Sequence, residues 1–101
     1  MNLSDFMVTE DKTILEVMKV IDHNAKGIAF VCKEGILLGV VTDGDIRRFI
    51  LRRGKLDTCI SEIANYNPKY VTNGDRIDYF TYMKQHSITV LPIVTKNHKL
   101  L

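Results

Sequence analysis

The stretch of sequence that decides the fold is Gly39-Val40-Val41-Thr42-Asp43-Gly44-Asp45-Ile46-Arg47-Arg48. An apolar run ends at Thr42 and apolar residues then recur at helical spacing, which predicts a strand that passes into a helix. The first turn of such a helix presents free backbone N–H groups and a positive dipole end, and both attract phosphate. Thr42 adds a hydroxyl, and the Asp45 carboxylate can accept both hydrogen bonds of a ribose diol. Arg47 or Arg48 can reach a phosphate as a forked donor.

Thr42 and Asp45 also fit a purely structural role. Thr-x-x-Asp is the spacing of a capping box, in which two side chains satisfy free amides of the helix start without a ligand. The motif alone supports ligand binding and capping about equally. Asp43 and Asp45 form an Asp-x-Asp pair that can hold a divalent metal, but the sequence offers no third ligand nearby, so we expect no metal site.

The residues before the motif predict a helix followed by a β-hairpin. Residues 13–24 carry apolar side chains at spacings of three and four, which predicts an amphipathic helix. Two β-branched and aromatic runs, at residues 28–32 and 36–42, flank a turn at residues 33–35. The helix after the motif should end at Gly54.

The chain contains an internal repeat with a spacing of 63 residues. The identical pairs are Val8/Val71, Thr9/Thr72, Ile14/Ile77, His23/His86, Val31/Val94, Lys33/Lys96, Leu37/Leu100 and Leu38/Leu101. The matches fall at apolar positions of the same periodicity, so duplication is the better interpretation. The second copy predicts a helix at about residues 76–86, a strand at 90–95, a turn at 96–98 and a strand that begins at 99–101.

The repeat predicts an α+β architecture of two small lobes, packed face to face about a pseudo-twofold axis. Each lobe should contain a helix and a β-hairpin or small sheet. We expect the first repeat at residues 1–55, a linker with a short helical piece at 56–69, and an incomplete second repeat at 70–101. Because the second hairpin stops within its second strand, backbone groups and apolar surface would stay uncovered. We therefore expect a truncated second repeat and a fragment of a longer protein.

The order helix, hairpin, Gly-apolar-apolar-Thr-x-x-Asp and helix, followed by a second copy, closely resembles the tandem CBS domain pair over almost the whole chain. In that family the module is regulatory and binds adenosine ligands such as AMP, ADP or ATP. The resemblance implies that Thr42 holds the phosphate, that Asp45 holds the ribose, and that the adenine lies between the repeats. The nucleotide site implied in this way consists of Thr42, Asp45, Gly39, Val8, Thr9, Ile28, Ala29 and Arg47.

Three segments within residues 42–68 resemble one kind of CBS pair more closely. They read Thr-Asp-Gly-Asp-Ile-Arg-Arg, Arg-Gly-Lys-Leu-Asp and Asn-Tyr-Asn-Pro, and they look most like the pair ahead of sugar-phosphate nucleotidyltransferase domains. Sugar-phosphate isomerases of the arabinose-5-phosphate type have a similar segment, but their CBS pair follows the catalytic domain. Because the chain opens at Met1, the resemblance favours a nucleotidyltransferase whose catalytic domain follows on the C-terminal side.

The module itself is not expected to be an enzyme, and two other roles stay open. One is a CBS module of a sugar-phosphate isomerase, and the other is a ligand-free oligomerisation or docking module. The resemblance also implies a homodimer. No catalytic triad can be assembled from the sequence and no cofactor is required, so an adenine nucleotide is expected only as a regulatory ligand.

Composition narrows the classes of partner. Fourteen basic and twelve acidic residues give a net charge of +2, too balanced for a protein dedicated to nucleic acid. Cys32 and Cys59 lie far apart with no histidine at metal-ligand spacing, which favours reduced thiols in the cytoplasm. No apolar run approaches the roughly 20 residues of a membrane span. We expect a cytoplasmic protein that binds neither membrane nor nucleic acid.

Overall fold

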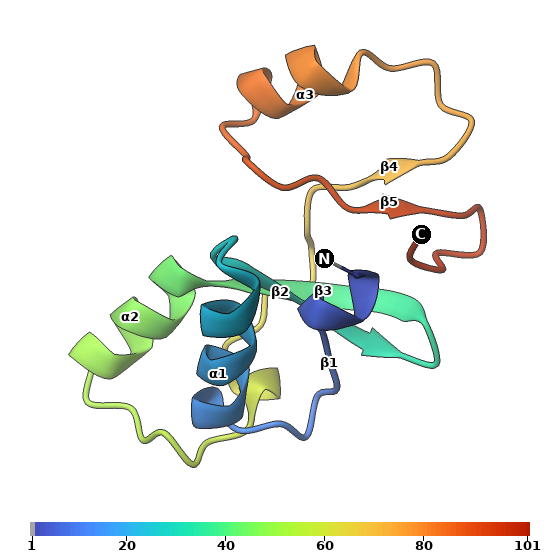
Figure 1. Cartoon of the computed structure of the whole chain (residues 1–101). Coiled ribbons are helices and arrows are strands. Elements are labelled where there is room, and N and C mark those ends of the chain that lie inside the picture. Colours follow the sequence, from blue (N-terminus) through green and yellow to red (C-terminus); the bar gives the residue numbers. More distant parts are fainter. Residues whose placement is uncertain (1) are drawn as a thin grey trace.

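In the computed structural model, which describes residues 2–101, the first lobe is a three-stranded sheet that two helices cover on one face (Figure 1). Its elements are the 3-10 helix η1 (Leu3–Phe6), β1 (Met7–Val8), α1 (Ile14–Asn24), β2 (Ile28–Lys33), β3 (Ile36–Thr42) and α2 (Asp43–Leu51). Strands β2 and β3 pair antiparallel, so the predicted hairpin is confirmed, and its turn places Glu34 and Gly35 at positive φ. Strand β1 pairs parallel with β2 and was not predicted, because two residues are too few to show alternation.

The second lobe contains β4 (Val71–Thr72), α3 (Tyr79–Gln85) and β5 (Ile93–Val94), with β4 and β5 paired parallel. The helix predicted from about residue 76 begins later because Asp78 caps it, accepting a hydrogen bond from the Thr81 amide (3.3 Å). The strand predicted at 90–95 shortens to β5, and the preceding Pro92 has no N–H to donate to a ladder.

The remaining predicted segments are shorter than expected. The helical piece of the linker is the three-residue 3-10 helix η2 (Ile60–Glu62). The strand predicted to begin at 99–101 consists of two isolated bridges, from Lys99 to Ile36 of β3 and from Leu100 to Val94 of β5. No helix within residues 2–101 combines the length and the apolarity needed to cross a membrane.

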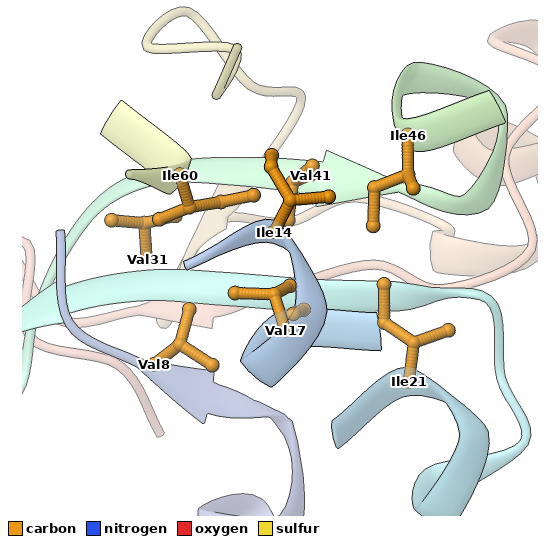
Figure 2. Packing of buried hydrophobic residues seen from close by; sticks show 9 residues of the cluster. Val8, Ile14, Val17, Ile21, Val31, Val41, Ile46 and Ile60 are labelled. Carbon is orange, nitrogen blue, oxygen red and sulfur yellow. The ribbon is translucent and has the colours of Figure 1, made fainter. Parts of the chain in front are cut away.

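The main core lies between the sheet and the two helices of the first lobe (Figure 2). Helix α1 contributes Ile14, Val17 and Ile21, which follow the helical spacing of three and four. The sheet contributes Val31 and Val41, and both are fully buried. The other members of this core are Val8, Ala29, Ile46 and Ile60.

The opposite face of the sheet packs against the second lobe, and Figure 1 shows the two lobes on opposite sides of β2 and β3. This second core contains Phe30, Cys32, Leu37 and Val40 from the sheet and Val94 and Leu100 from the second lobe. Residues of β2 therefore alternate between the two cores, as a strand that is buried on both faces must. A bulge between Val31 and Cys32 shifts the register and brings Leu37 opposite Cys32.

Candidate functional site

The strand-to-helix motif forms a complete capping box at the start of α2. The Asp45 amide donates to Thr42 Oγ1 (3.2 Å), and the Thr42 amide donates to Asp45 Oδ2 (2.9 Å). The capping interpretation of Thr42 and Asp45 is therefore confirmed. It leaves Asp45 Oδ1 outside the cap.

Asp45 Oδ1 accepts a hydrogen bond from Arg48 Nη2 at 3.0 Å. The Arg48 guanidinium folds back over the first helical turn, where a Cβ at Gly44 would lie 3.1 Å from Arg48 Nη1. The positive charge of Arg48 therefore lies near the positive end of the helix dipole, which is unfavourable by itself. The Asp45 carboxylate offsets this repulsion, and a bound phosphate would offset it as well. In this structure both oxygens of the Asp45 carboxylate are thus occupied by groups of the same helix start.

A cavity of about 160 Å³ lies between the two lobes beside this motif, and we call it the interlobe cavity. Its lining residues are Lys26, Gly27, Ile28, Thr42, Ser87, Ile88, Thr89 and Val90. The 63-residue repeat pairs residues 26–28 with residues 89–91, so the cavity lies where equivalent segments of the two repeats meet. Of the predicted site residues, Thr42 and Ile28 line it.

The first-lobe wall of the cavity is held by Asn24, which is fully buried at the end of α1. Asn24 Nδ2 donates to the carbonyls of Asp5 and Ile28, both at 3.1 Å, and Asn24 Oδ1 accepts from the Lys26 amide at 2.9 Å. Gly27 adopts a φ of 74°, and its carbonyl accepts the Asp43 amide at 3.0 Å. The sequence analysis named Ile28 of this wall and ended the helix at residue 24, but it did not anticipate the hydrogen bonds through which Asn24 holds the loop.

Two of the predicted site residues, Ala29 and Gly39, lie in tightly packed parts of the structure. Ala29 is fully buried in the main core. Gly39 lies where the linker crosses the sheet, and a Cβ there would lie 2.6 Å from the Asn65 carbonyl oxygen. The Val40 and Asn65 backbones exchange hydrogen bonds of 2.9 and 2.8 Å at this crossing. Both Ala29 and Gly39 therefore serve packing, and neither lines the interlobe cavity.

Three other predicted residues line separate cavities. Val8 and Thr9 border a cavity of about 200 Å³ near the hairpin turn, beside Cys32 and Gly35. The prediction placed them with the adenine, but β1 pairs with the middle of β2, beyond the Ile28 end that faces the interlobe cavity. Burial raises the pKa of the Cys32 thiol to about 11, so this thiol stays protonated near neutral pH.

Arg47 borders a groove of about 570 Å³ between α1 and α2 that we call the helix groove. It is lined by Met18, Ile21, Asp22, Ala25, Gly27, Asp43, Ile46, Arg47, Ile50 and Leu51. Arg47 and Arg48 thus point to different surroundings although they are neighbours in sequence. Within residues 2–101, no three His, Cys, Asp or Glu side chains gather closely enough to hold a metal ion.

Comparison with known proteins finds a family model that matches the first lobe and a solved structure with the same fold. Residues 1–52 match the family model described as CBS domain. A CBS domain protein from Pyrobaculum aerophilum, solved in complex with AMP, superposes with a TM-score of 0.81 at 29% sequence identity. The superposition covers 94% of this chain and 75% of that one.

The similar curated proteins are much longer than this chain. An arabinose 5-phosphate isomerase GutQ from Salmonella typhi is 32% identical over 90 residues, which are 87% of this chain and 28% of that enzyme. An arabinose 5-phosphate isomerase KdsD from Francisella tularensis is 34% identical over 92 residues, or 89% of this chain and 27% of that enzyme. The family match over half of the sequence, together with the α+β fold and the shared superposition, shows that the chain belongs to the CBS domain family.

Proposed function

We propose that this chain is a regulatory module that binds an adenine nucleotide in the interlobe cavity. The observation that carries the proposal is the position of Thr42, which lines a cavity formed by equivalent segments of both repeats. A ligand in this position contacts both lobes at once. It would therefore bind one arrangement of the lobes better than another and shift the population of an attached enzyme.

The lining of the interlobe cavity suits a nucleoside. Ile28, Ile88 and Val90 offer apolar surface to a base, and the hydroxyls of Thr42 and Thr89 offer hydrogen bonds. At about 160 Å³ the cavity is smaller than the roughly 300 Å³ at which pockets for whole ligands begin. The base would fill the cavity, and the ribose and phosphate would extend over the start of α2. The AMP bound to the Pyrobaculum aerophilum protein supports this class of ligand.

Asp45 would bind the ribose by exchanging one partner. Its Oδ2 stays with the Thr42 amide, while its Oδ1 releases Arg48 and accepts a ribose hydroxyl. The released guanidinium lies beside the helix start, where it can donate to the phosphate. The cap and the ligand site then use the same two side chains without conflict.

The attached enzyme is proposed to act on a sugar phosphate. The curated relatives favour an arabinose 5-phosphate isomerase, which was the alternative in the sequence analysis. The nucleotidyltransferase remains a prediction based on sequence resemblance, and these relatives give it no support. A cytoplasmic location likewise remains a prediction.

A homodimer is supported by the helix groove. Ile50 and Leu51 on its border are 41% and 75% exposed, so the groove offers apolar surface to a partner. Its charged residues are of both signs, Asp22 and Asp43 against Arg47. A twofold copy can pair Arg47 of one chain with an aspartate of the other, as an isologous interface requires. Light scattering on a sizing column should give twice the chain mass, and Leu51→Asp should return the monomer.

Calorimetric titration with AMP, ADP and ATP tests the nucleotide proposal. Asp45→Asn keeps an oxygen for the Thr42 amide but loses the charge, so we expect nearly wild-type stability and at least tenfold weaker nucleotide binding. Asp57→Asn, on an exposed linker residue, is the matched control and should bind as the wild type does. A folded wild-type chain that shows neither heat nor thermal stabilisation at millimolar nucleotide would contradict the nucleotide proposal and favour the ligand-free oligomerisation or docking module.

A further inference from the structure

Asn24 connects the wall of the interlobe cavity with the N-terminal helix η1. Among residues 2–101 it is the one buried polar or charged residue. Its Nδ2 donates to the carbonyls of Ile28 and Asp5, and its Oδ1 accepts from the Lys26 amide. Ile28 and Lys26 line the cavity, whereas Asp5 belongs to η1, which lines no part of it. One side chain therefore links the cavity wall to a segment outside the cavity.

The planar amide of Asn24 transmits the position of the wall to η1. Its two N–H donors and its carbonyl acceptor point in fixed directions. The wall engages the acceptor and one donor, so its position sets the direction of the second donor, which bonds Asp5. Because Asn24 is fully buried, losing the bond to Asp5 would leave a donor unpaired at a cost in free energy. A movement of residues 26–28 therefore changes how firmly η1 is held.

Helix η1 is also in contact with the core between the two lobes. Leu3 and Phe6 pack against this second core, and the ring of Phe6 stacks on Phe30 with centroids 5.6 Å apart. The same core contains Val94 and Leu100 of the second lobe. A change in how the lobes meet therefore also reaches η1 through apolar contacts.

The stability of η1 depends on these contacts, because the helix has little of its own. It comprises four residues and buries none of them. Segments with few buried contacts open locally at low free energy. The hydrogen bond from Asn24 and the stacking of Phe6 thus determine how often η1 detaches from the first lobe.

We propose that Asn24 is a positioning residue that couples the wall of the interlobe cavity to the attachment of η1. The inference rests on the proposed nucleotide function and adds to it a route by which binding acts outside the cavity. A base that packs on Ile28 fixes the wall, the wall fixes the Asn24 amide, and the amide holds Asp5. Because coupling between two sites is reciprocal, attachment of η1 strengthens nucleotide binding by the same factor.

Hydrogen exchange of the full chain with and without AMP tests the coupling. The amides of Asp5 and Met7 report on η1, since they donate to the carbonyls of Asn2 and Ser4. Because η1 opens locally, AMP slows these amides only if it binds the attached form more tightly. Saturating AMP should slow them about threefold to tenfold, the range for one hydrogen bond. Deletion of residues 2–5 should weaken AMP binding in calorimetry by the same factor.

Asn24→Ala separates coupling from a purely structural role. With the amide removed, saturating AMP should no longer slow exchange in η1. Thr13→Ala is the matched control, because it removes the cap at the other end of α1 and should keep the protection of η1 by AMP. Equal behaviour of the two variants would show that Asn24 only stabilises the helix. If Asn24→Ala does not fold, the deletion of residues 2–5 leaves Asn24 in place and tests the coupling by itself.

A measurement without nucleotide distinguishes the coupling from the nucleotide function. Deletion of residues 2–5 should speed exchange of the Lys26 amide, because Asn24, which accepts from it, loses its partner Asp5. If the wild type binds no AMP but the Lys26 amide responds, the nucleotide function is wrong and the coupling holds. If the deletion changes neither Lys26 exchange nor AMP affinity, the coupling is overturned. Bound AMP without protection of η1 in the wild type overturns it as well.

Discussion

Helices α1 and α3 occupy equivalent places in the two repeats and have opposite environments. Val17 of α1 is fully buried, whereas its equivalent, Phe80 of α3, is 77% exposed. Ile14 is fully buried and its equivalent Ile77 is 38% exposed. Helix α1 buries four of its residues and α3 buries none.

The difference shows that an amphipathic pattern needs a surface to pack against. In the first lobe the sheet and α2 cover the apolar side of α1. Within residues 71–101 the sheet has two short strands, and no further helix lies against α3. The second lobe is instead joined to the first through Val94 and Leu100, on the far side of the shared sheet. Similar sequence patterns therefore contribute very different stability in the two lobes.

The largest expected effect comes from truncating the two equivalent isoleucines. Ile14→Ala leaves a void in the main core and should lower the free energy of unfolding by about 2–5 kcal/mol. Ile77→Ala, at a partly exposed position, should cost less than about 1 kcal/mol. Urea unfolding followed by circular dichroism measures both. Equal losses in the two variants would contradict the contrast between the lobes.

Two glycines provide a second pair of variants. A Cβ at Gly39 meets the Asn65 carbonyl oxygen at 2.6 Å, so Gly39→Ala should push the linker away and cost about 1–3 kcal/mol. Gly74 in the second lobe has no atom within 4 Å of a Cβ and only its φ of 91° restricts it, so Gly74→Ala should cost about 1 kcal/mol or less. The same unfolding assay checks both. A smaller loss of stability for Gly39→Ala than for Gly74→Ala would contradict the close contact between the linker and the sheet at Gly39.

Loss of the α1 cap should lower the stability of the whole chain, whereas loss of the α3 cap should destabilise only that helix. Thr13→Ala removes the box formed with Glu16 at the start of α1 and should cost about 1 kcal/mol of global stability. Asp78→Ala removes the cap of α3, which buries no residues, so the loss should stay local. Hydrogen exchange should show faster exchange in α3 alone for Asp78→Ala and across the first lobe for Thr13→Ala. Global destabilisation by Asp78→Ala would show that α3 is coupled to the core.

The smallest effect concerns the cysteines, and it is measured by thiol reactivity and by the dependence of stability on alkaline pH. Cys32 is buried between the lobes and Cys59 is exposed, so iodoacetamide should modify Cys59 and spare Cys32 in the folded chain. Because the folded pKa of Cys32 is raised to about 11, its contribution to stability is present below the unfolded thiol pKa of roughly 8.5. That contribution is lost as the pH rises towards 11. Cys32→Ala should remove this part of the alkaline destabilisation.

The sequence predicted the features that depend on local pattern. The change of periodicity at Thr42 located the end of β3 and the start of α2, and the capping spacing anticipated the bonds between Thr42 and Asp45. Strands β1 and β4 have two residues each, too few to produce alternation, and they form because partner strands lie beside them. Their existence depends on tertiary contacts that a local pattern does not encode.

The candidate site was predictable only in part, for the same reason. Thr42 and Ile28 were named from the motif and from the family resemblance, and they line the interlobe cavity. The opposite wall, residues 87–90, comes from the other repeat and carries no motif of its own. The hydrogen bond between Arg48 and Asp45 depends on the side-chain conformation of Arg48. The spacing in the sequence does not decide whether Arg47, Arg48 or solvent contacts this carboxylate.

The hydrogen bonds at the hairpin turn have a mechanical consequence for the whole module. Leu37 N–H donates to the His98 carbonyl and Leu100 N–H to the Gly35 carbonyl, so the lobes are fastened at the end of the sheet remote from Thr42. The seven residues of β3 span roughly 20 Å at about 3.3 Å per residue, which separates this fastening from the interlobe cavity. The hairpin end is then the axis about which the two lobes can rotate relative to each other. A rotation of a few degrees about the hairpin end changes the gap at Thr42 by about an ångström while the bonds at the pivot stay intact.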